Sequence, residues 1–353
     1  MLSRFNICSK EYIIRQYDHE VQGGSVVKPL VGKENDGPSD AAVLRPLLDS
    51  YEGVVVSNGI CPRYSDIDTY HMMACAIDEA IRNNVAVGGS IERMVGLDNF
   101  CWPDPVQSEK TPDGEYKLAQ LVRANKALYD FTTAFGVPCI SGKDSMKNDY
   151  LIGNTKISIP PTVLFSVMGK IDDVRKAVTM DAKGTGHLVY VVGRTLNELG
   201  GSEYYAMKGY IGNTVPKVDA PRAVDLYRRL NEATGKELIS SCHDCSDGGL
   251  GVALAETSFS GGSGMAIDLR RAPATGVARD DFLLFSETQS RFVVTVCPEK
   301  REAFERVFTG REYGLLGKTT SSGIFKVIGL GGKEIIRADI RNLKAAWKRP
   351  LGI

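Results

Sequence analysis

The chain has 353 residues, enough for two domains of ordinary size that each bury a core. Lys plus Arg and Asp plus Glu both number 43, so no net field favours nucleic acid or an anionic membrane surface as partner. No run approaches the roughly 18 apolar residues of a membrane span, and charges interrupt the first twenty positions, which argues against a signal peptide. We therefore expect a cytoplasmic protein whose 8 cysteines are free thiols.

Strands and helices alternate in the first half of the chain. Apolar side chains recur at helical spacing over residues 68–87 and stop at Gly88, which predicts a helix. The predicted elements of this half are a strand, loop and strand over 23–46 with Asp40 at the loop exit, a strand at 53–59, helices at 68–87 and 116–135, a polar loop at 141–148 and a strand at 160–171.

The second half follows the same alternation. A charged segment at 172–186 precedes a fresh buried strand, so we place the boundary after residue 172, which gives domains 1–172 and 173–353. The order of the predicted helices and strands indicates a mixed α and β fold of two layered domains. It does not decide whether the sheets are parallel or antiparallel. The predicted elements are strands at 187–193, 237–242, 291–296 and 325–329, helices at 220–234 and 250–259, a glycine-rich loop at 198–205 and a hairpin turn at 329–333.

The segment SCHDCSDGGLG, residues 241–251, joins an apolar strand to a helix. The glycines at 248–249 would lie at the helix N-terminus, where free N–H groups and the helix dipole attract phosphate. Asp244 would then face a divalent cation such as Mg²⁺, which prefers oxygen ligands. An equally acceptable interpretation is that Ser246 or Asp247 only caps the helix. The sequence does not decide between the two aspartates as metal ligand.

Three further polar residues are candidate ligands. Glu79 and Asn83 lie four apart on the first predicted helix, so their side chains share one face, although a solvated polar pair has the same spacing. Asp40 is either a ligand or an ordinary turn residue. The usual phosphate-loop and dinucleotide fingerprints are absent, so any nucleotide site is of another type. Cys242 and Cys245 lack a second ligand pair, so we expect neither zinc nor redox chemistry there.

A family resemblance covers nearly the whole chain. The sequence resembles the C-terminal half of phosphoribosylformylglycinamidine synthase (formylglycinamide ribonucleotide amidotransferase), of purine biosynthesis, in the strings RQYDHEVQGGSVVKPLVG, GPSDAAVLRP, DEAIRN, LDNFCWPDP, SGKDSMKN, LGGSEYY and HDCSDGGLGVALAE. The resemblance implies an aminoimidazole ribonucleotide synthetase-like fold, with an N-terminal α/β domain that dimerises through its sheet and a C-terminal α/β layered domain. It implies a ligase that turns formylglycinamide ribonucleotide, ATP and glutamine-derived ammonia into the amidine, ADP and phosphate.

The resemblance also implies site residues and the cofactors Mg²⁺ and ATP or ADP. Ser39 and Ser246 would lie beside the nucleotide. Gly142, Lys143 and Ser145 correspond to a segment that touches ATP and substrate in shorter members. Lys143 replaces an Asn of those members, which argues against a metal contact there. The implied magnesium ligands are Asp40, Glu79, Asn83 and Asp244.

Several family features are absent from this sequence. The E-x-H-N-H-P type string, the catalytic histidine of the first half and the glutaminase motifs do not occur, so no catalytic residue is assigned. We expect a nucleotide-binding half that pairs with itself or, as a pseudo-dimer, with the N-terminal synthetase half, and that receives ammonia from a glutaminase subunit. It is either a split subunit or a shortened chain. The alternative is a non-catalytic structural half that holds ADP or ATP with magnesium.

Overall fold

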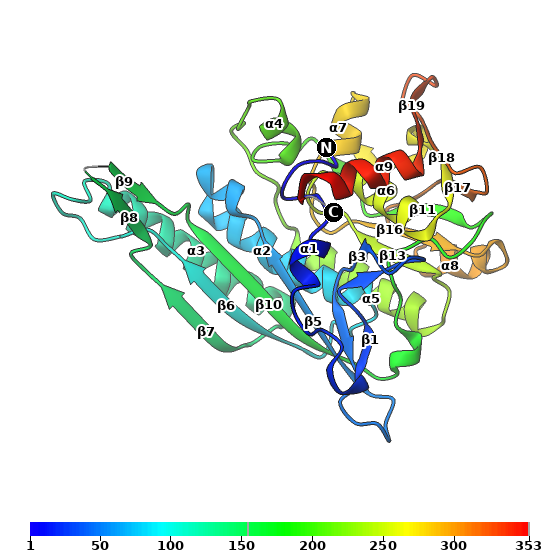
Figure 1. The fold of residues 1–353 in the computed structure, drawn as a ribbon, viewed down its shortest axis with the longest axis horizontal. Helices are drawn as coiled ribbons and strands as arrows, with labels where there is room; N and C mark the ends of the chain where they lie inside the picture. Colours follow the sequence, from blue (N-terminus) through cyan, green and yellow to red (C-terminus); the bar gives the residue numbers. More distant parts are fainter. Residues whose placement is uncertain (154, 352–353) are drawn as a thin grey trace.

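The computed structural model describes residues 1–153 and 155–351 (Figure 1). Two large sheets, with the helices that cover them, form the molecule. The strands of the first sheet lie within residues 25–171, and those of the second within 188–339. The predicted boundary after residue 172 falls between these two ranges.

The first sheet has six strands and two long helices on one face. In sheet order its strands are β1 (Ser25–Val27), β4 (Ala42–Leu44), β5 (Gly53–Ile60), β10 (Thr162–Ile171), β6 (Met94–Cys101) and β7 (Cys139–Ser145). Neighbours are antiparallel except β6 and β7. Helix α2 (Thr69–Ala86) packs on β5 and β10, and α3 (Gly114–Phe135) packs on α2. Side chains of β5 alternate between buried and exposed, as expected for a sheet with one face on the core.

Both long helices of the first half confirm the predictions at 68–87 and 116–135. The Asp68 carboxylate caps α2 by accepting hydrogen bonds from the backbone N–H groups of Tyr70 and His71. Helix α3 ends at Gly136, whose φ of 68° is left-handed and therefore suits glycine. None of the described helices is both long and apolar enough to cross a membrane.

The second sheet has seven strands, and its strands β13, β16 and β11 are buried on both faces. In sheet order these are β13 (Ser241–Asp244), β16 (Phe292–Val296), β11 (Leu188–Val192), β17 (Tyr313–Thr320), β14 (Gly264–Asp268), β18 (Ile324–Ile328) and β19 (Glu334–Asp339), with only β14 and β18 parallel. Tyr190 and Val192 of β11 belong to one core cluster, while Val189 and Val191 belong to another. The predicted strand at 237–242 is confirmed only from Ser241 onward.

Helices cover both faces of the second sheet. The first cluster joins it to α5 (Ala220–Gly235) and α8 (Arg301–Val307), and the second joins it to α6 (Gly249–Gly261) and α9 (Ile340–Lys348). Because the first cluster also contains the buried side chains of α2, that helix is packed against both halves of the molecule. The remaining elements are short: α1 (Glu11–Ile14), α4 (Glu203–Met207), α7 (Asp280–Phe285) and the strand pairs β2 (Leu30–Val31) with β3 (Gly37–Pro38), β8 (Asp149–Ile152) with β9 (Thr155–Ser158), and β12 (Thr195–Leu196) with β15 (Ala274–Thr275).

The N-terminal segment packs with the second half of the chain. Ile7 lies in the core cluster of α6 and α9, and its carbonyl accepts a 2.9 Å hydrogen bond from the indole N–H of Trp347. The backbone N–H of Ser9 donates to the Trp347 carbonyl. The first residues of the chain therefore pack on the core of the second half, ahead of the strands of the first sheet. Apolar periodicity in the sequence did not predict this packing.

One predicted loop is largely a strand. The segment 141–148 was expected to be a polar loop, but its first five residues lie in β7, which pairs with β6 at the sheet edge. The β7 side chains are almost all exposed, so no apolar alternation marks the strand. Its pairing partner, and not its own propensity, fixes its conformation.

Candidate metal and nucleotide site

A buried acidic cluster lies where three parts of the chain meet. Asp40 comes from the turn between β3 and β4, His243 and Asp244 from β13, and Glu256 from α6. The side chains of Asp40 and His243 are 1% and 8% exposed. Among residues 1–153 and 155–351, Asp40, His243 and Asp244 are the one group of three such side chains whose ligand atoms all lie within 4.8 Å of one another.

His243 is held between two carboxylates. Its Nδ1 lies 2.7 Å from Asp40 Oδ1, and its Nε2 lies 3.0 Å from Glu256 Oε2. Burial alone lowers the pKa of His243, but the charges and hydrogen bonds of Asp40 and Glu256 outweigh it and place the pKa well above its ordinary value. The charged imidazolium, which donates from both nitrogens, suits this arrangement.

Asp244 is tied to helix α2 by a buried arginine. Arg82 Nε donates to Asp244 Oδ2 at 3.0 Å, and Arg82 also pairs with Asp78 one helical turn earlier at 2.9 Å. The Ser246 hydroxyl donates to Asp244 and accepts from Arg82. Oδ2 of Asp244 is therefore engaged, which leaves Oδ1 as the oxygen for a cation. The backbone N–H of Asp244 donates to Asp40, so the two carboxylates are held side by side.

Glu79 and Asn83 point toward the end of β5. Glu79 Oε2 accepts from the backbone N–H of Ile60 at 2.9 Å, and Asn83 Nδ2 donates to the Asn58 carbonyl at 3.1 Å. Burial raises the pKa of Glu79, and the nearby charge of Asp244 adds to it against the opposing effect of Arg82. Glu79 of α2 and Asp244 of β13 thus act on one another electrostatically.

Two buried oxygens in this region support a cation-binding role. Within the described part of the chain, Asp40 Oδ2 and Asn83 Oδ1 have no hydrogen-bond partner. Unpaired buried acceptors are uncommon in native structures, and carboxylate and amide oxygens are what Mg²⁺ prefers. The residues present therefore fit magnesium. The group of three includes Asp244 and not Asp247, which favours Asp244 between the two aspartates.

The helix N-terminus at the predicted phosphate loop is partly filled by the protein. Gly248, in the left-handed region with φ of 79°, precedes α6, and its N–H donates to Glu287 Oε1 at 2.9 Å. Neither Ser246 nor Asp247 caps the helix, so the capping interpretation is wrong. The anion at this N–H is Glu287, which also accepts from the Tyr64 hydroxyl.

The remaining predicted nucleotide contacts lie elsewhere. Gly142, Lys143 and Ser145 lie on β7, which forms the edge of the first sheet opposite the β1 edge (Figure 1). The Ser39 hydroxyl donates to the Ala41 carbonyl beside the cluster, and Ser246 is inside it. The nine predicted site residues therefore fall into three groups. Ser39, Asp40, Asp244 and Ser246 lie at the acidic cluster, Glu79 and Asn83 lie on α2 beside the end of β5, and Gly142, Lys143 and Ser145 lie on β7.

The sequence reasoning missed four residues that organise the site, and three of them left a signal. Asp78 and Arg82 are an i, i+4 pair on the face of α2 opposite to solvent, and both are almost fully buried. Glu256 is an acid in an otherwise apolar stretch, VALAE, which is unusual unless a partner is provided. Glu287 comes from a turn more than thirty residues from the glycines it binds, so no local pattern indicates its position.

Comparisons with known proteins agree with this fold along the chain. Residues 184–329 match the family described as AIR synthase related protein, C-terminal domain. Phosphoribosylformylglycinamidine synthase subunit PurL of Thermoplasma acidophilum is 33% identical over 352 residues, which is 99% of this chain and 44% of the relative. The PurL subunit of Methanocaldococcus jannaschii is 34% identical over 354 residues, which is 98% of this chain and 45% of the relative.

Solved structures show the same fold. Phosphoribosylformylglycinamidine synthase II of Thermotoga maritima superposes with a TM-score of 0.72 at 16% identity, covering 99% of this chain and 51% of that one. T. maritima PurL complexed with FGAR gives a TM-score of 0.69 at 17% identity, covering 90% and 49%. The chain spans a little under half the length of the curated relatives it matches. It thus carries an AIR synthase related C-terminal domain and is similar, along nearly its whole length, to part of the phosphoribosylformylglycinamidine synthase subunit PurL.

Proposed function

We propose that this chain is the second half of an ATP-dependent, amidine-forming ligase of purine biosynthesis. In this proposal the assembled enzyme converts formylglycinamide ribonucleotide, ATP and ammonia into formylglycinamidine ribonucleotide, ADP and phosphate. The observation that carries it is the similarity to PurL subunits over 99% of the chain, together with a buried acidic cluster that contains Asp40 and Asp244, two of the four magnesium ligands that the resemblance implies. T. maritima PurL, which shares the fold, has been solved with FGAR, ATP and ADP.

The acidic cluster supports a magnesium and nucleotide site. Asp40, Glu79, Asn83 and Asp244 would hold Mg²⁺, and Ser39 and Ser246 would lie beside the nucleotide. The ion would neutralise charge on phosphate oxygens. The residues of this chain supply the rest: His243 and Arg82 hold the two aspartates in place, and burial keeps water from them.

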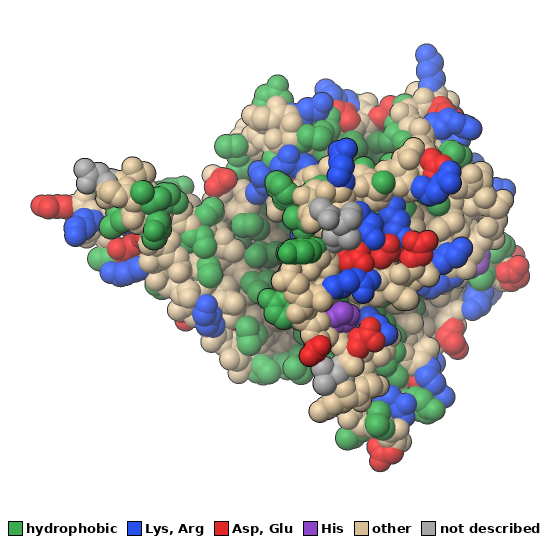
Figure 2. Space-filling model, viewed as in Figure 1, with side chains coloured by type: hydrophobic (Ala, Val, Ile, Leu, Met, Phe, Trp, Pro, Cys, Tyr) green, Lys and Arg blue, Asp and Glu red, His purple; other side chains and the backbone are tan. Residues whose placement is uncertain are grey.

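An exposed apolar sheet face supports association with a homologous half. On β5 and β10 the side chains that face away from α2 include exposed Val56, Ile60 and Met168, and Leu44 of β4 adds to them. Figure 2 shows hydrophobic side chains over this region and at the tip formed by β8 and β9. An exposed apolar patch of this kind marks an interaction surface. We propose that it pairs with a second copy or with the N-terminal synthetase half, and that a glutaminase subunit delivers the ammonia.

Reconstitution tests the proposal. The chain is mixed with a separately produced N-terminal half of a PurL relative, formylglycinamide ribonucleotide, ammonium and Mg-ATP, and phosphate release is followed. We expect release that requires both halves and the ribonucleotide. Release that is equal without this chain would contradict the proposal.

The burial of the cluster favours a second candidate function. Asp40 and Asp244 side chains are 1% and 7% exposed, which suits a nucleotide that is held and not turned over. In that case ADP would co-purify with the chain and would neither exchange nor be hydrolysed during turnover of the assembly. Exchange of labelled ADP at the turnover rate would exclude this second candidate.

A further inference from the structure

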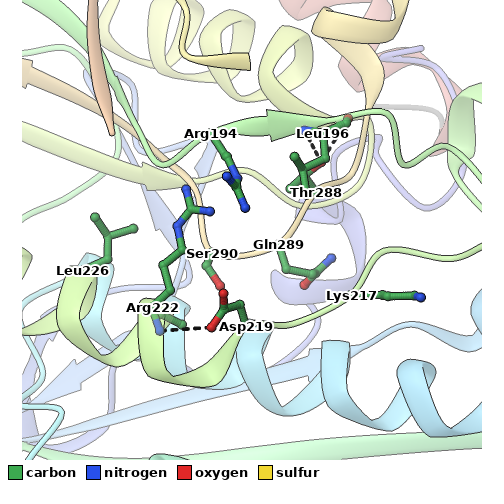
Figure 3. A pocket seen from close by; sticks show the side chains of 10 residues that line it. Arg194, Leu196, Lys217, Asp219, Arg222, Leu226, Thr288, Gln289 and Ser290 are labelled. Atoms are coloured by element: carbon green, nitrogen blue, oxygen red, sulfur yellow. Dashed lines mark hydrogen bonds between the residues drawn. The ribbon is translucent and has the colours of Figure 1, made fainter. Parts of the chain in front are cut away.

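A pocket on the second half of the chain gathers cationic side chains (Figure 3). Its inner part has a volume of about 60 Å³ and is lined by the turn at 288–290, the start of α5 and the β11–β12 connection. It shares Arg194, Asp219 and Arg222 with an outer hollow of about 610 Å³ that continues to Glu312. The small inner part can take a group of a few heavy atoms, and the outer hollow leaves room for the rest of a ligand.

Two arginines converge on this pocket from different elements. Arg194 follows β11, and Arg222 lies in the first turn of α5. Figure 3 shows their guanidinium groups extending toward the same space. Both pair with one carboxylate, Glu312, with Arg194 Nη1 at 3.4 Å from Glu312 Oε1. Lys217 also lines the pocket.

The positive charge of the pocket is only partly balanced. Burial, and then the neighbouring charge of Arg194, lower the pKa of Arg222. Within the described residues the buried Nε of Arg194 has no hydrogen-bond partner. Asp219 caps α5 through the Arg222 backbone N–H. The other nearby acid, Asp225, is held by Arg229 and Arg311.

We propose that this pocket binds a phosphate group, either as a phosphate monoester or as inorganic phosphate. Arginine forks match phosphate oxygens with two parallel hydrogen bonds, and the N-terminus of the 16-residue helix α5 adds its partial positive charge. Glu312, the carboxylate that pairs with both arginines, would compete with that phosphate. Ser290 and Thr288 line the same space with hydroxyl groups.

Buried hydrogen bonds and ion pairs connect the pocket to the acidic cluster. The Ser290 hydroxyl donates to Asp78 Oδ1 at 2.9 Å, and its backbone N–H donates to Oδ2. Asp78 pairs with Arg82, which holds Asp244. A phosphate seated against the 288–290 turn therefore contacts the segment that positions the magnesium ligands. The two sites use different residues, so each can be tested without the other.

Phosphate titration of the full chain tests the inference. Binding of inorganic phosphate and of ribose 5-phosphate is measured by calorimetry at constant ionic strength, with EDTA present so that no magnesium site contributes. We expect Arg222→Met to weaken both at least tenfold. Arg228→Met is the matched control, because Arg228 lies on the same helix but pairs with Glu92 at the surface. This variant should bind inorganic phosphate and ribose 5-phosphate as tightly as the parent chain. Equal phosphate binding by Arg222→Met and the parent chain would overturn the proposal.

For a second variant we expect tighter phosphate binding, a result that misfolding cannot produce. Glu312→Gln removes the competing carboxylate, so both ligands should bind severalfold more tightly. Weaker or unchanged binding by Glu312→Gln would count against the pocket. Tighter binding of ribose 5-phosphate than of phosphate would identify a monoester as the ligand, and the reverse order would identify inorganic phosphate. The result is independent of the proposed ligase activity, since no ATP, magnesium or partner is present.

Discussion

His243 and Asp40, 203 positions apart in the chain, are joined by a 2.7 Å contact between Nδ1 and Oδ1. This contact links the turn between β3 and β4, within the first half of the chain, to a strand of the second sheet. With Glu256 on the other ring nitrogen, it leaves two buried carboxylates dependent on one imidazole.

We expect His243→Ala to lower the free energy of unfolding by about 3 kcal/mol, because removing one partner of a buried charged network leaves the others uncompensated. Adding Glu256→Gln to that variant should recover part of the loss, because one unpaired buried charge disappears. Urea unfolding measures both. His71→Ala, at a half-buried histidine of α2, is the control and should cost less. Full additivity of the His243 and Glu256 changes would contradict the network.

The buried Arg82 gives a second stability prediction. Arg82→Met leaves Asp78 and Asp244 without their cation, so we expect a loss of about 3–5 kcal/mol in unfolding free energy. The matched control is Arg93→Met, whose partly exposed pair with Asp172 should contribute about 0–1 kcal/mol. Similar losses for the two variants in urea unfolding would show that the buried pair has no special role.

Asp36 predicts acid-dependent stability. It is buried and pairs with Lys344 at 2.7 Å and Lys348 at 3.0 Å. Burial raises the pKa of Asp36, but the two lysines outweigh it and bring the pKa below its ordinary value of 3.8. A lowered carboxylate pKa stabilises the folded state above the unfolded pKa, and this contribution is lost as the pH falls through the folded pKa.

The parent chain should therefore exceed Asp36→Asn in unfolding free energy by about 1 kcal/mol near pH 6, after allowance for solvent screening. The difference should shrink below about pH 4, where the unfolded state begins to bind the proton, and disappear once the pH falls below the folded pKa. Guanidinium unfolding at several pH values measures it. A difference that stays constant from pH 6 to pH 3 would refute the assignment to this carboxylate.

The apolar sheet face gives a prediction about association. Met168→Lys, on the exposed face of β10, should weaken self-association or pairing with the N-terminal half at least tenfold, because a charge is then buried at the interface. The unfolding free energy of the monomer should change by less than about 0.5 kcal/mol, as for other surface changes. Val122→Lys, at an exposed apolar position on α3, is the matched control for sedimentation measurements. Equal association constants for both variants would place the interface elsewhere.

The sequence predicted the regular elements of this fold well where periodicity is strong. The helices at 68–87 and 116–135 were identified because apolar spacing and glycine ends agree, and β5 because β-branched residues run together. Strand β7 was missed because an exposed edge strand has no apolar alternation. The docking of residues 1–9 on the C-terminal core depends on Trp347, which is distant in sequence.

Sequence reasoning could propose candidate ligands for the site, but it did not identify the residues that hold those candidates in place. Glu79 and Asn83 share a helix face, so their joint direction follows from spacing alone. The contact of Asp40 with β13 is long-range, and only the family resemblance pointed to it. Arg82 and Glu287 are polar residues buried by tertiary contacts, and no local rule gives the pairing of Arg82 with Asp244 or of Glu287 with the Gly248 N–H.

The central claim is that Asp40, Glu79, Asn83 and Asp244 hold one magnesium ion against a nucleotide. Calorimetric titration of the chain with ADP, with and without Mg²⁺, tests it most directly in the parent, Asp40→Asn and Glu79→Ala. Glu52→Ala, at an exposed glutamate paired with Lys170, is the control. We predict that magnesium tightens ADP binding in the parent and the control. In each site variant, the ratio of ADP affinities with and without magnesium should be at least tenfold smaller than in the parent. Equal magnesium dependence in all four proteins would contradict the claim.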